Sequence, residues 1–84
     1  MITVRVRYFA GARAAAGVAE EDVALTDPAT VDAALVAIGD RHGTGLARVL
    51  AASSFLVNAV AVRDRALPLG EGDSLDVLPP FAGG

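Results

Sequence analysis

Hydrophobic and polar residues alternate at the start of the chain, as they do in a strand with one buried face. The stretch is ITVRVRYF, residues 2–9. The residues expected inside are Ile2, Val4, Val6 and Tyr8, and those expected outside are Thr3, Arg5, Arg7 and Phe9. A second, shorter strand is predicted for VAEEDVAL, residues 18–25, with Val23 and Leu25 inward. The connection, residues 10–17, predicts an antiparallel hairpin whose loop holds about one helical turn.

The strongest helical pattern lies between the second strand and the middle of the chain. Its apolar residues recur at the spacing of one helix face, and they are Val31, Ala34, Leu35 and Ile38. Thr30 stands where an N-terminal cap belongs, and Gly43 stands where a left-handed residue would end the helix. His42, in the last turn, is expected to be a surface residue stabilised by the helix dipole.

The rest of the chain predicts one more helix and further strands. The predicted segments are a short helix at 45–52, a strand at 54–62 interrupted around Asn58, a turn-rich stretch at 63–73 and a final strand at 74–78. In the final strand, SLDVL, alternation places Leu75 and Val77 inward.

This order of elements, a hairpin, a helix and then further strands, favours an α+β fold of the β-grasp, or ubiquitin-like, type. A mixed sheet would pack on one main helix, because that helix has a single apolar face. The first and last strands would lie parallel in the middle of the sheet. On the open face, Arg5 or Arg7 could pair with Asp76, a contact worth about a few tenths of a kcal/mol. We expect one β-grasp domain over residues 1–78 and a flexible, extended tail over residues 79–84.

Composition narrows the possible functions. The 84 residues are 54% hydrophobic, include no cysteine and carry a net charge of −3. Since acidic residues outnumber basic ones, we expect no nucleic-acid partner and favour a protein partner with a basic face. We expect no signal peptide, and no apolar run in the sequence is long enough to span a membrane, so we expect a cytoplasmic protein without membrane contact. All seven basic residues are arginine, so copies cannot be linked through their own lysines.

The candidate catalytic residues do not form a recognisable site. His42 is the sole histidine, and with no cysteine present no metal site is predicted. Ser53 and Ser54 lack the glycine pattern of a nucleophile elbow. The acidic run at residues 20–22 reads as a solvated strand edge, because alternation separates neighbouring carboxylates onto opposite faces. We therefore expect a protein that binds no cofactor and catalyses nothing alone.

The C-terminal segment, PPFAGG, has a different character. Pro79 and Pro80 favour an extended path away from the domain, and the five residues after Pro79 could span up to about 17 Å. Gly83 and Gly84 have no Cβ, so this backbone could enter a channel closed to larger residues. The segment predicts a tail that presents the Gly84 carboxylate for chemistry. ATP would convert the carboxylate to an acyl-adenylate, and a sulfur nucleophile would then give a thiocarboxylate.

These residues resemble the MoaD/ThiS family of sulfur carriers, most closely the carriers that form the small subunit of molybdopterin synthase. The resemblance spans the whole chain through VRYFAGARAAAG, TVDAAL, LVN and LPLGEGDSLDVLPPFAGG, of which the last is the specific part. It implies a non-catalytic carrier whose Gly84 is activated by a ubiquitin-activating-like adenylyltransferase that uses ATP. It implies a second partner, the large subunit of molybdopterin synthase, which receives the tail and catalyses dithiolene formation.

The resemblance also implies roles for the tail and for a docking face. Gly83 would supply the narrow passage behind Pro79 and Pro80, and Phe81 would anchor the tail where it enters the partner. Many relatives have a smaller aliphatic residue at the position of Phe81, which implies a receiving pocket of different shape. The candidates for docking on the open face are Phe9, Leu56, Leu78 and Phe81, beside Arg5 and Arg7. A different strand register would instead place Phe9 or Leu56 in the core.

The leading hypothesis is sulfur delivery for molybdenum-cofactor biosynthesis. One alternative keeps the chemistry but delivers sulfur for thiamine or cysteine biosynthesis. Thiamine carriers are usually shorter, and the segment GLARVLAA argues mildly against them, whereas cysteine-pathway carriers have a similar length and tail. A further alternative is a ubiquitin-like protein modifier, or a β-grasp module that only binds partners.

Overall fold

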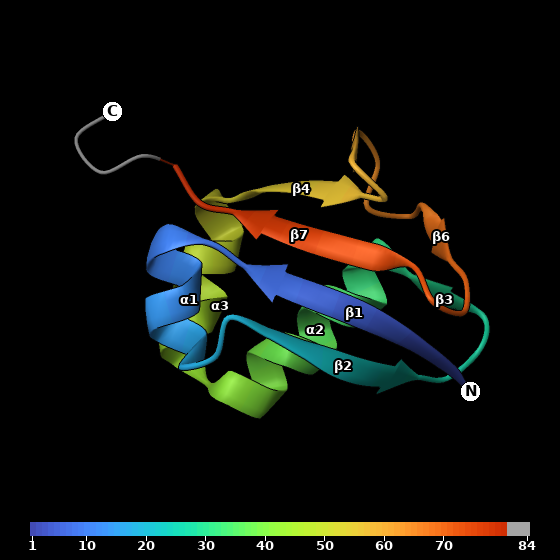
Figure 1. Cartoon of the computed structure of the whole chain (residues 1–84), viewed down its shortest axis with the longest axis horizontal. Helices are drawn as coiled ribbons and strands as arrows, with labels where there is room; N and C mark the ends of the chain where they lie inside the picture. The colour runs from blue at the N-terminus through green and yellow to red at the C-terminus, as the bar shows by residue number, and fades with distance from the viewer. Residues whose placement is uncertain (81–84) are drawn as a thin grey trace.

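The first and last strands of the chain lie side by side in the middle of one sheet (Figure 1). The computed structural model describes residues 1–80. In chain order the elements are β1 (Ile2–Tyr8), α1 (Ala10–Ala16), β2 (Glu20–Leu25), β3 (Ala29–Thr30), α2 (Val31–His42), α3 (Thr44–Ala52), β4 (Ser54–Val57), β5 (Val60–Ala61), β6 (Pro68–Leu69) and β7 (Ser74–Leu78). The five-stranded sheet has the order β2-β1-β7-β4-β5, and β3 pairs with β6 in a separate two-stranded sheet.

The central pair of strands is parallel, whereas the outer pairs are antiparallel. The β1–β7 register runs from Arg5 opposite Ser74 to Tyr8 opposite Val77. β2 pairs with the other side of β1, and β4 pairs with the other side of β7. The helices between β2 and β4 provide the long crossover that a parallel pair requires. This mixed sheet confirms the predicted β-grasp fold.

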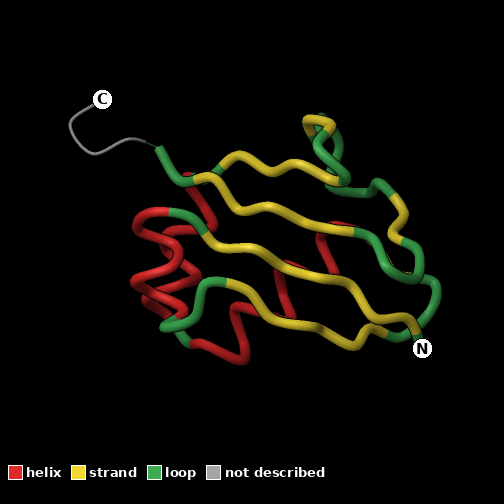
Figure 2. The backbone as a smooth tube through the Cα atoms, in the orientation of Figure 1, coloured by secondary structure: helices red, strands yellow, loops and turns green. Residues whose placement is uncertain are grey.

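Helices cover one face of the sheet, and the hydrophobic core lies between the two layers (Figure 2). Buried and exposed residues alternate along β1 as predicted, and Val4 and Val6 are completely buried. The predicted apolar stripe of α2 is also buried, and it consists of Val31, Ala34, Leu35 and Ile38. Leu75 and Val77 of β7 complete the core from the centre of the sheet. The opposite, open face carries the outward residues of the same strands.

The connection between β1 and β2 is the seven-residue helix α1, where the sequence predicted a loop with about one helical turn. Its residues, AGARAAA, are mostly strong helix formers. Gly17 ends the helix in the left-handed conformation, and its N–H donates to the carbonyl of Arg13. Because α1 contacts α3, three helices form the second layer and not α2 alone. No helix within residues 1–80 has the length and apolarity needed to cross a membrane.

Both predicted ends of α2 are observed, but the C-terminal end has a different geometry. At the N-terminus the Thr30 hydroxyl accepts a hydrogen bond from the Ala33 N–H at 3.2 Å. At the C-terminus Gly43 has φ 90° and ψ −170°, which is not the predicted left-handed cap. Helix α3 begins at the next residue, so the chain must turn sharply at one position that only glycine readily adopts.

The predicted interruption at Asn58 is a tight turn between β4 and β5. Asn58 and Ala59 both have positive φ angles, 50° and 69°, as in the two-residue turns that join antiparallel strands. The Asn58 side chain also accepts a hydrogen bond from the Ser74 N–H at 3.0 Å and donates one to Asp73 at 3.0 Å. The turn is thereby fixed to the start of β7.

The burial of α2 can be tested with two neighbouring residues. Ile38 is completely buried, whereas Val36 is 59% exposed. Replacing Ile38 by Ala should lower the free energy of unfolding by about 2–5 kcal/mol, because it removes buried methyl groups and leaves a cavity. The matched variant Val36→Ala should change it by less than about 0.5 kcal/mol. Urea unfolding followed by circular dichroism would measure both.

If Ile38→Ala does not fold, the smaller truncation Ile38→Val should still fold and cost about 0.5–1.5 kcal/mol. Equal effects at the two positions would contradict the assigned face of α2.

Candidate functional site

The residues predicted to bind a partner lie at the open face of the sheet. Arg5 and Arg7 occupy exposed positions of β1, between its buried residues. Leu56 of β4 lies opposite Asp76 of β7. On the other side of β7, Asp76 lies opposite Arg7 of β1. Leu56 is half-buried, whereas its neighbour Phe55 belongs to the core. The register alternative that placed Leu56 in the core is therefore wrong.

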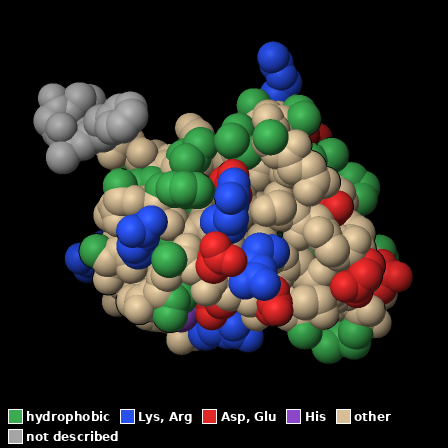
Figure 3. All heavy atoms as spheres, viewed as in Figure 1, with side chains coloured by type: hydrophobic (Ala, Val, Ile, Leu, Met, Phe, Trp, Pro, Cys, Tyr) green, Lys and Arg blue, Asp and Glu red, His purple; other side chains and the backbone are tan. Residues whose placement is uncertain are grey.

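The open face divides into a charged part and an apolar part (Figure 3). Acidic and basic side chains gather over its middle, and hydrophobic side chains form a band between them and the end of the described chain. Leu78, the last residue of β7, and Phe9, directly after β1, are half-buried at this end. The geometry is compatible with docking at this face, and the docking itself stays a prediction.

Arg7 and Asp76 form the predicted ion pair across the open face. Arg7 Nε donates to Asp76 Oδ1 at 2.7 Å, and Nη2 donates to Oδ2 at 2.8 Å. The hydrogen bond to Asp76 and the charge of that carboxylate raise the pKa of Arg7. Its guanidinium also lies 5.6 Å from the centre of the Phe9 ring. Arg5, the other candidate, pairs instead with Glu20 and Asp22 of β2, at 3.0 and 3.1 Å.

The two tail prolines are described, and they begin at the edge where β1 and β7 both end. Pro79 is half-buried and Pro80 is exposed. Both line a groove of about 430 Å³ whose other walls are Ala10, Gly11, Arg48, Val49 and Ala52. The base of the tail thus lies between the open face and the helices α1 and α3. Phe81, Gly83 and Gly84, for which tail roles were predicted, lie outside the described residues.

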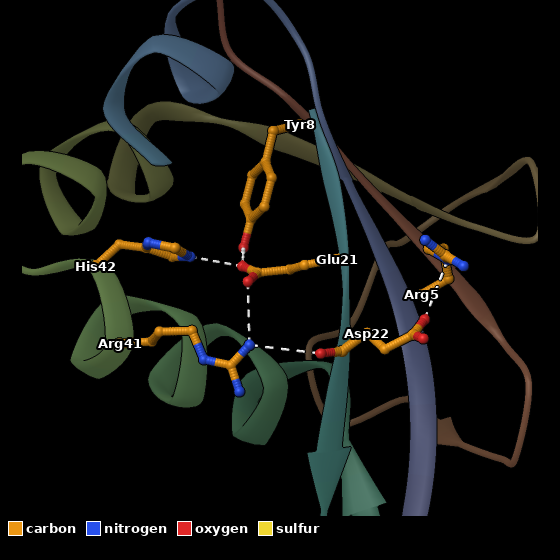
Figure 4. Close-up of polar contacts among 6 residues, drawn as sticks. All are labelled: Arg5, Tyr8, Glu21, Asp22, Arg41 and His42. Carbon is orange, nitrogen blue, oxygen red and sulfur yellow. Dashed lines mark hydrogen bonds and ion pairs between the residues drawn. The ribbon is translucent and has the colours of Figure 1, made fainter. Parts of the chain in front are cut away.

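A cluster of polar side chains around Glu21 was not predicted (Figure 4). Tyr8 donates its hydroxyl hydrogen to Glu21 Oε2 at 2.6 Å, and Arg41 donates to Oε1 at 3.0 Å. His42 Nε2 lies 2.5 Å from Oε2, and the His42 ring meets the Tyr8 ring edge to face. The cluster joins β1, β2 and the C-terminal end of α2.

Two expectations are therefore wrong: Glu21 is not a solvated edge residue, and His42 is not a surface residue. Their side chains are only 17% and 15% exposed. The alternation of β2 explains this, because Glu20 and Asp22 face outward with Arg5 while Glu21 faces the helices. The signal was present in the sequence, since the period that placed Val23 inward also places Glu21 inward.

The electrostatics of the cluster indicate a structural role. Burial raises the pKa of Tyr8, and its hydrogen bond to Glu21 raises it further. Burial also acts to raise the pKa of Glu21, but the hydrogen bonds from Tyr8, His42 and Arg41 outweigh it and lower the pKa. Both oxygens of the carboxylate thus have hydrogen-bond partners within the protein. Within residues 1–80, no group of three or more acidic or histidine side chains is arranged to hold a metal ion.

The mixed sheet, its helical layer and the tail that follows the last strand define a ubiquitin-like protein of the β-grasp fold. A profile of the ThiS family matches residues 6–84, and the chain belongs to this family. The match includes the C-terminal glycines. ThiS-type proteins are small ubiquitin-like sulfur carriers or protein modifiers, and they are not themselves enzymes.

Solved structures agree with this assignment. A Pyrococcus furiosus protein provisionally named molybdopterin converting factor subunit 1 has a TM-score of 0.82 and 28% identity, over 96% of this chain and 100% of its own. Small archaeal modifier protein 1 (SAMP1) from Haloferax volcanii has a TM-score of 0.86 and 28% identity, and the match covers 98% of this chain and 99% of its own. A chain in the complex of subunits 1 and 2 of molybdopterin-converting factor from Helicobacter pylori 26695 shares the fold, with a TM-score of 0.72 and 24% identity. The match covers 99% of this chain and 100% of that chain. Comparison with curated proteins gives no match.

Glu21 should make the folded protein sensitive to acid. Its pKa is lower in the folded protein than the ordinary value of 4.5, so the unfolded chain takes up the proton first. Stability should be fully present above that value and should be lost as the pH falls through the folded pKa. Glu21→Gln should flatten this loss, which urea unfolding between about pH 6 and about pH 3 would measure.

The control is Glu20→Gln, which makes the same change in charge on a side chain that is 52% exposed. It should keep the wild-type pH dependence. Asp73 adds a second acid-sensitive contribution, because the N–H of Gly70 and the amide of Asn58 lower its pKa. A Glu21→Gln profile parallel to that of the wild type would show that the cluster does not stabilise the fold.

Proposed function

We propose that this chain is a sulfur carrier whose Gly84 carboxylate is converted to a thiocarboxylate, and that it serves as the small subunit of a molybdopterin synthase. The observation that carries the proposal is the ThiS family match, which runs through the tail to Gly84. The geometry supports it, because the tail starts at the sheet edge where Phe9 and Leu78 adjoin the open face. The acceptor pathway is chosen on the resemblance of the tail block to molybdopterin-synthase carriers.

The proposed reaction replaces one carboxylate oxygen by sulfur in two steps. First, the Gly84 carboxylate attacks the α-phosphorus of ATP on a ubiquitin-activating-like adenylyltransferase, and pyrophosphate leaves. Second, a sulfide-equivalent nucleophile attacks the acyl carbon of the adenylate, and AMP leaves. Adenylation is needed because the negative charge of a free carboxylate repels nucleophiles. The enzyme binds the ATP, and the carrier supplies only the reacting terminus.

The carrier contributes delivery. Pro79 and Pro80 restrict the backbone at the base of the tail, so less conformational entropy is lost when the tail enters a channel. Gly83 and Gly84 present no Cβ to the walls of that channel. Phe81 would anchor the tail at the channel mouth, while the open face docks on the partner. The same parts would serve the adenylyltransferase first and the large synthase subunit afterwards.

A second candidate function has a specific observation in its favour. SAMP1 from Haloferax volcanii is a modifier by name, and it matches this chain with the same identity as the Pyrococcus furiosus protein. A modifier would use the same adenylate but would pass the Gly84 acyl group to an amine of another protein. The fold serves both outcomes, because the two differ only in the nucleophile that attacks the activated terminus.

Thiocarboxylation is tested by mass. Incubation with the cognate adenylyltransferase, ATP and a sulfur donor should shift the intact mass by one oxygen-for-sulfur exchange, and deletion of Gly84 should abolish the shift. Gly83→Ala should slow the reaction, because its Cβ would narrow the fit to the channel. Gly45→Ala is the matched control, since a Cβ at Gly45 meets nothing within 4 Å and should leave the rate unchanged. An unchanged wild-type mass with a competent enzyme would contradict the proposal.

The acceptor is tested by recovery of bound proteins. Tagged carrier should retain the large subunit of a molybdopterin synthase from an extract of its own cells. Deletion of Gly83 and Gly84 should reduce the amount of large subunit retained. Recovery of a thiazole synthase or a cysteine synthase instead would assign thiamine or cysteine biosynthesis. Protein adducts that survive reducing denaturing gels and depend on Gly84 would assign the modifier function.

A further inference from the structure

Arg7 and Asp76 join the two central strands beside the edge where the tail begins. They stand directly opposite each other in the parallel register, one step before its last pair, Tyr8 and Val77. After that pair β7 loses its neighbour on the β1 side. Leu78 is then paired only with Ser54 of β4. Among the described residues, the ion pair is therefore the last hydrogen-bonded side-chain link between β1 and β7 before the tail.

We propose that Arg7 and Asp76 are positioning residues that fix the direction in which the tail leaves the sheet. The inference rests on the proposed function, because it concerns how the Gly84 carboxylate is delivered. Pro79 and Pro80 follow directly after Leu78, the last residue of β7, so a change in the end of the strand is passed on to a stiff segment. Over a reach of about 17 Å, a swing of about 10° displaces the terminus by about 3 Å. A misplacement of about 1 Å can already cost about a hundredfold in rate.

This ion pair differs from an ordinary surface pair. Asp76 is only 5% exposed and is the one buried charged residue among those the structure describes. Both of its oxygens accept from Arg7, in the two-point geometry that gives strength and direction. Phe9 lies against the same guanidinium, so Arg7 connects β7 to the residue that follows β1. Loss of either partner would leave the other without its charge partner at the end of the strand.

Arg5 also lies on the open face of β1, but its side chain does not connect β1 to β7. It is as exposed as Arg7, with both side chains at 46%, and it also forms ion pairs. Its partners, Glu20 and Asp22, lie on β2 and have no connection to the tail. Of these two arginine side chains, it is that of Arg7 that binds β7, the strand from which the tail continues.

Amide hydrogen exchange on the carrier alone tests the positioning directly. In Arg7→Gln and in Asp76→Asn, exchange at Leu78 should be about tenfold faster than in the wild type, because the end of β7 opens more often. The matched control is Arg41→Gln. Arg41 is 47% exposed and also pairs with a mostly buried carboxylate, that of Glu21, but it lies on α2. It should leave exchange at Leu78 unchanged, and unchanged exchange in the Arg7 and Asp76 variants would overturn the inference.

Kinetics with the cognate adenylyltransferase then separate positioning from direct contact. Positioning predicts that Arg7→Gln and Asp76→Asn each lower kcat for thiocarboxylation about tenfold or more, with little change in KM. The double variant should be no worse than either single one, since both remove one unit. A higher KM in Arg7→Gln alone, with Asp76→Asn unaffected, would show that Arg7 touches the enzyme and would overturn the inference.

The two proposals fail in different ways. If wild-type carrier is never thiocarboxylated by a competent enzyme, the proposed function is wrong, and the exchange measurement still decides whether the pair holds the end of β7. If the wild type reacts and the two variants react equally well, the proposed function stands and the positioning role is wrong.

Discussion

The parallel pairing of β1 with β7 is the contact on which the rest of the structure depends. It joins the first strand to the last, and the hairpin strand β2 and the helical crossover lie between them in the chain. It also brings the C-terminal ends of both strands to one edge of the sheet. The tail therefore starts beside Phe9 and next to the open face. In this fold the point at which the tail leaves the sheet is set by the most non-local strand pairing.

The alternation of the strands gives each face of the sheet a separate task. Inward residues of β1 and β2 build the core and the Glu21 cluster, which fixes α2 against the sheet. Outward residues carry the ion pairs of Arg5 and Arg7 and the half-buried Leu56. Because the helices cover only the inward face, the open face can dock on a partner without disturbing the core. The proposed function, in which the carrier visits two partners in turn, needs this separation.

The sequence predicted the elements whose signals are local. Alternation defined β1 and β7, the apolar stripe defined α2, and Asn58 marked the turn after β4. Prediction from the sequence was weaker where the structure depends on contacts between residues far apart in the chain. Arg5 and Arg7 were equivalent in pattern, and only the parallel register assigned Asp76 to Arg7. Glu21 and His42 are separated by 21 positions and meet only through packing of α2 on the sheet.

The helix α1 was missed for a different reason, since a run of seven residues is short for a helix and its stability comes largely from contact with α3. The tail roles of Phe81, Gly83 and Gly84 rest on the family and on backbone chemistry. The central claim is that the open face and the tail together form the working surface. Chemical-shift mapping of the labelled carrier against its adenylyltransferase tests this most directly. The account predicts changes at Leu56, Leu78 and the tail, whereas changes confined to α2 and α3 would contradict it.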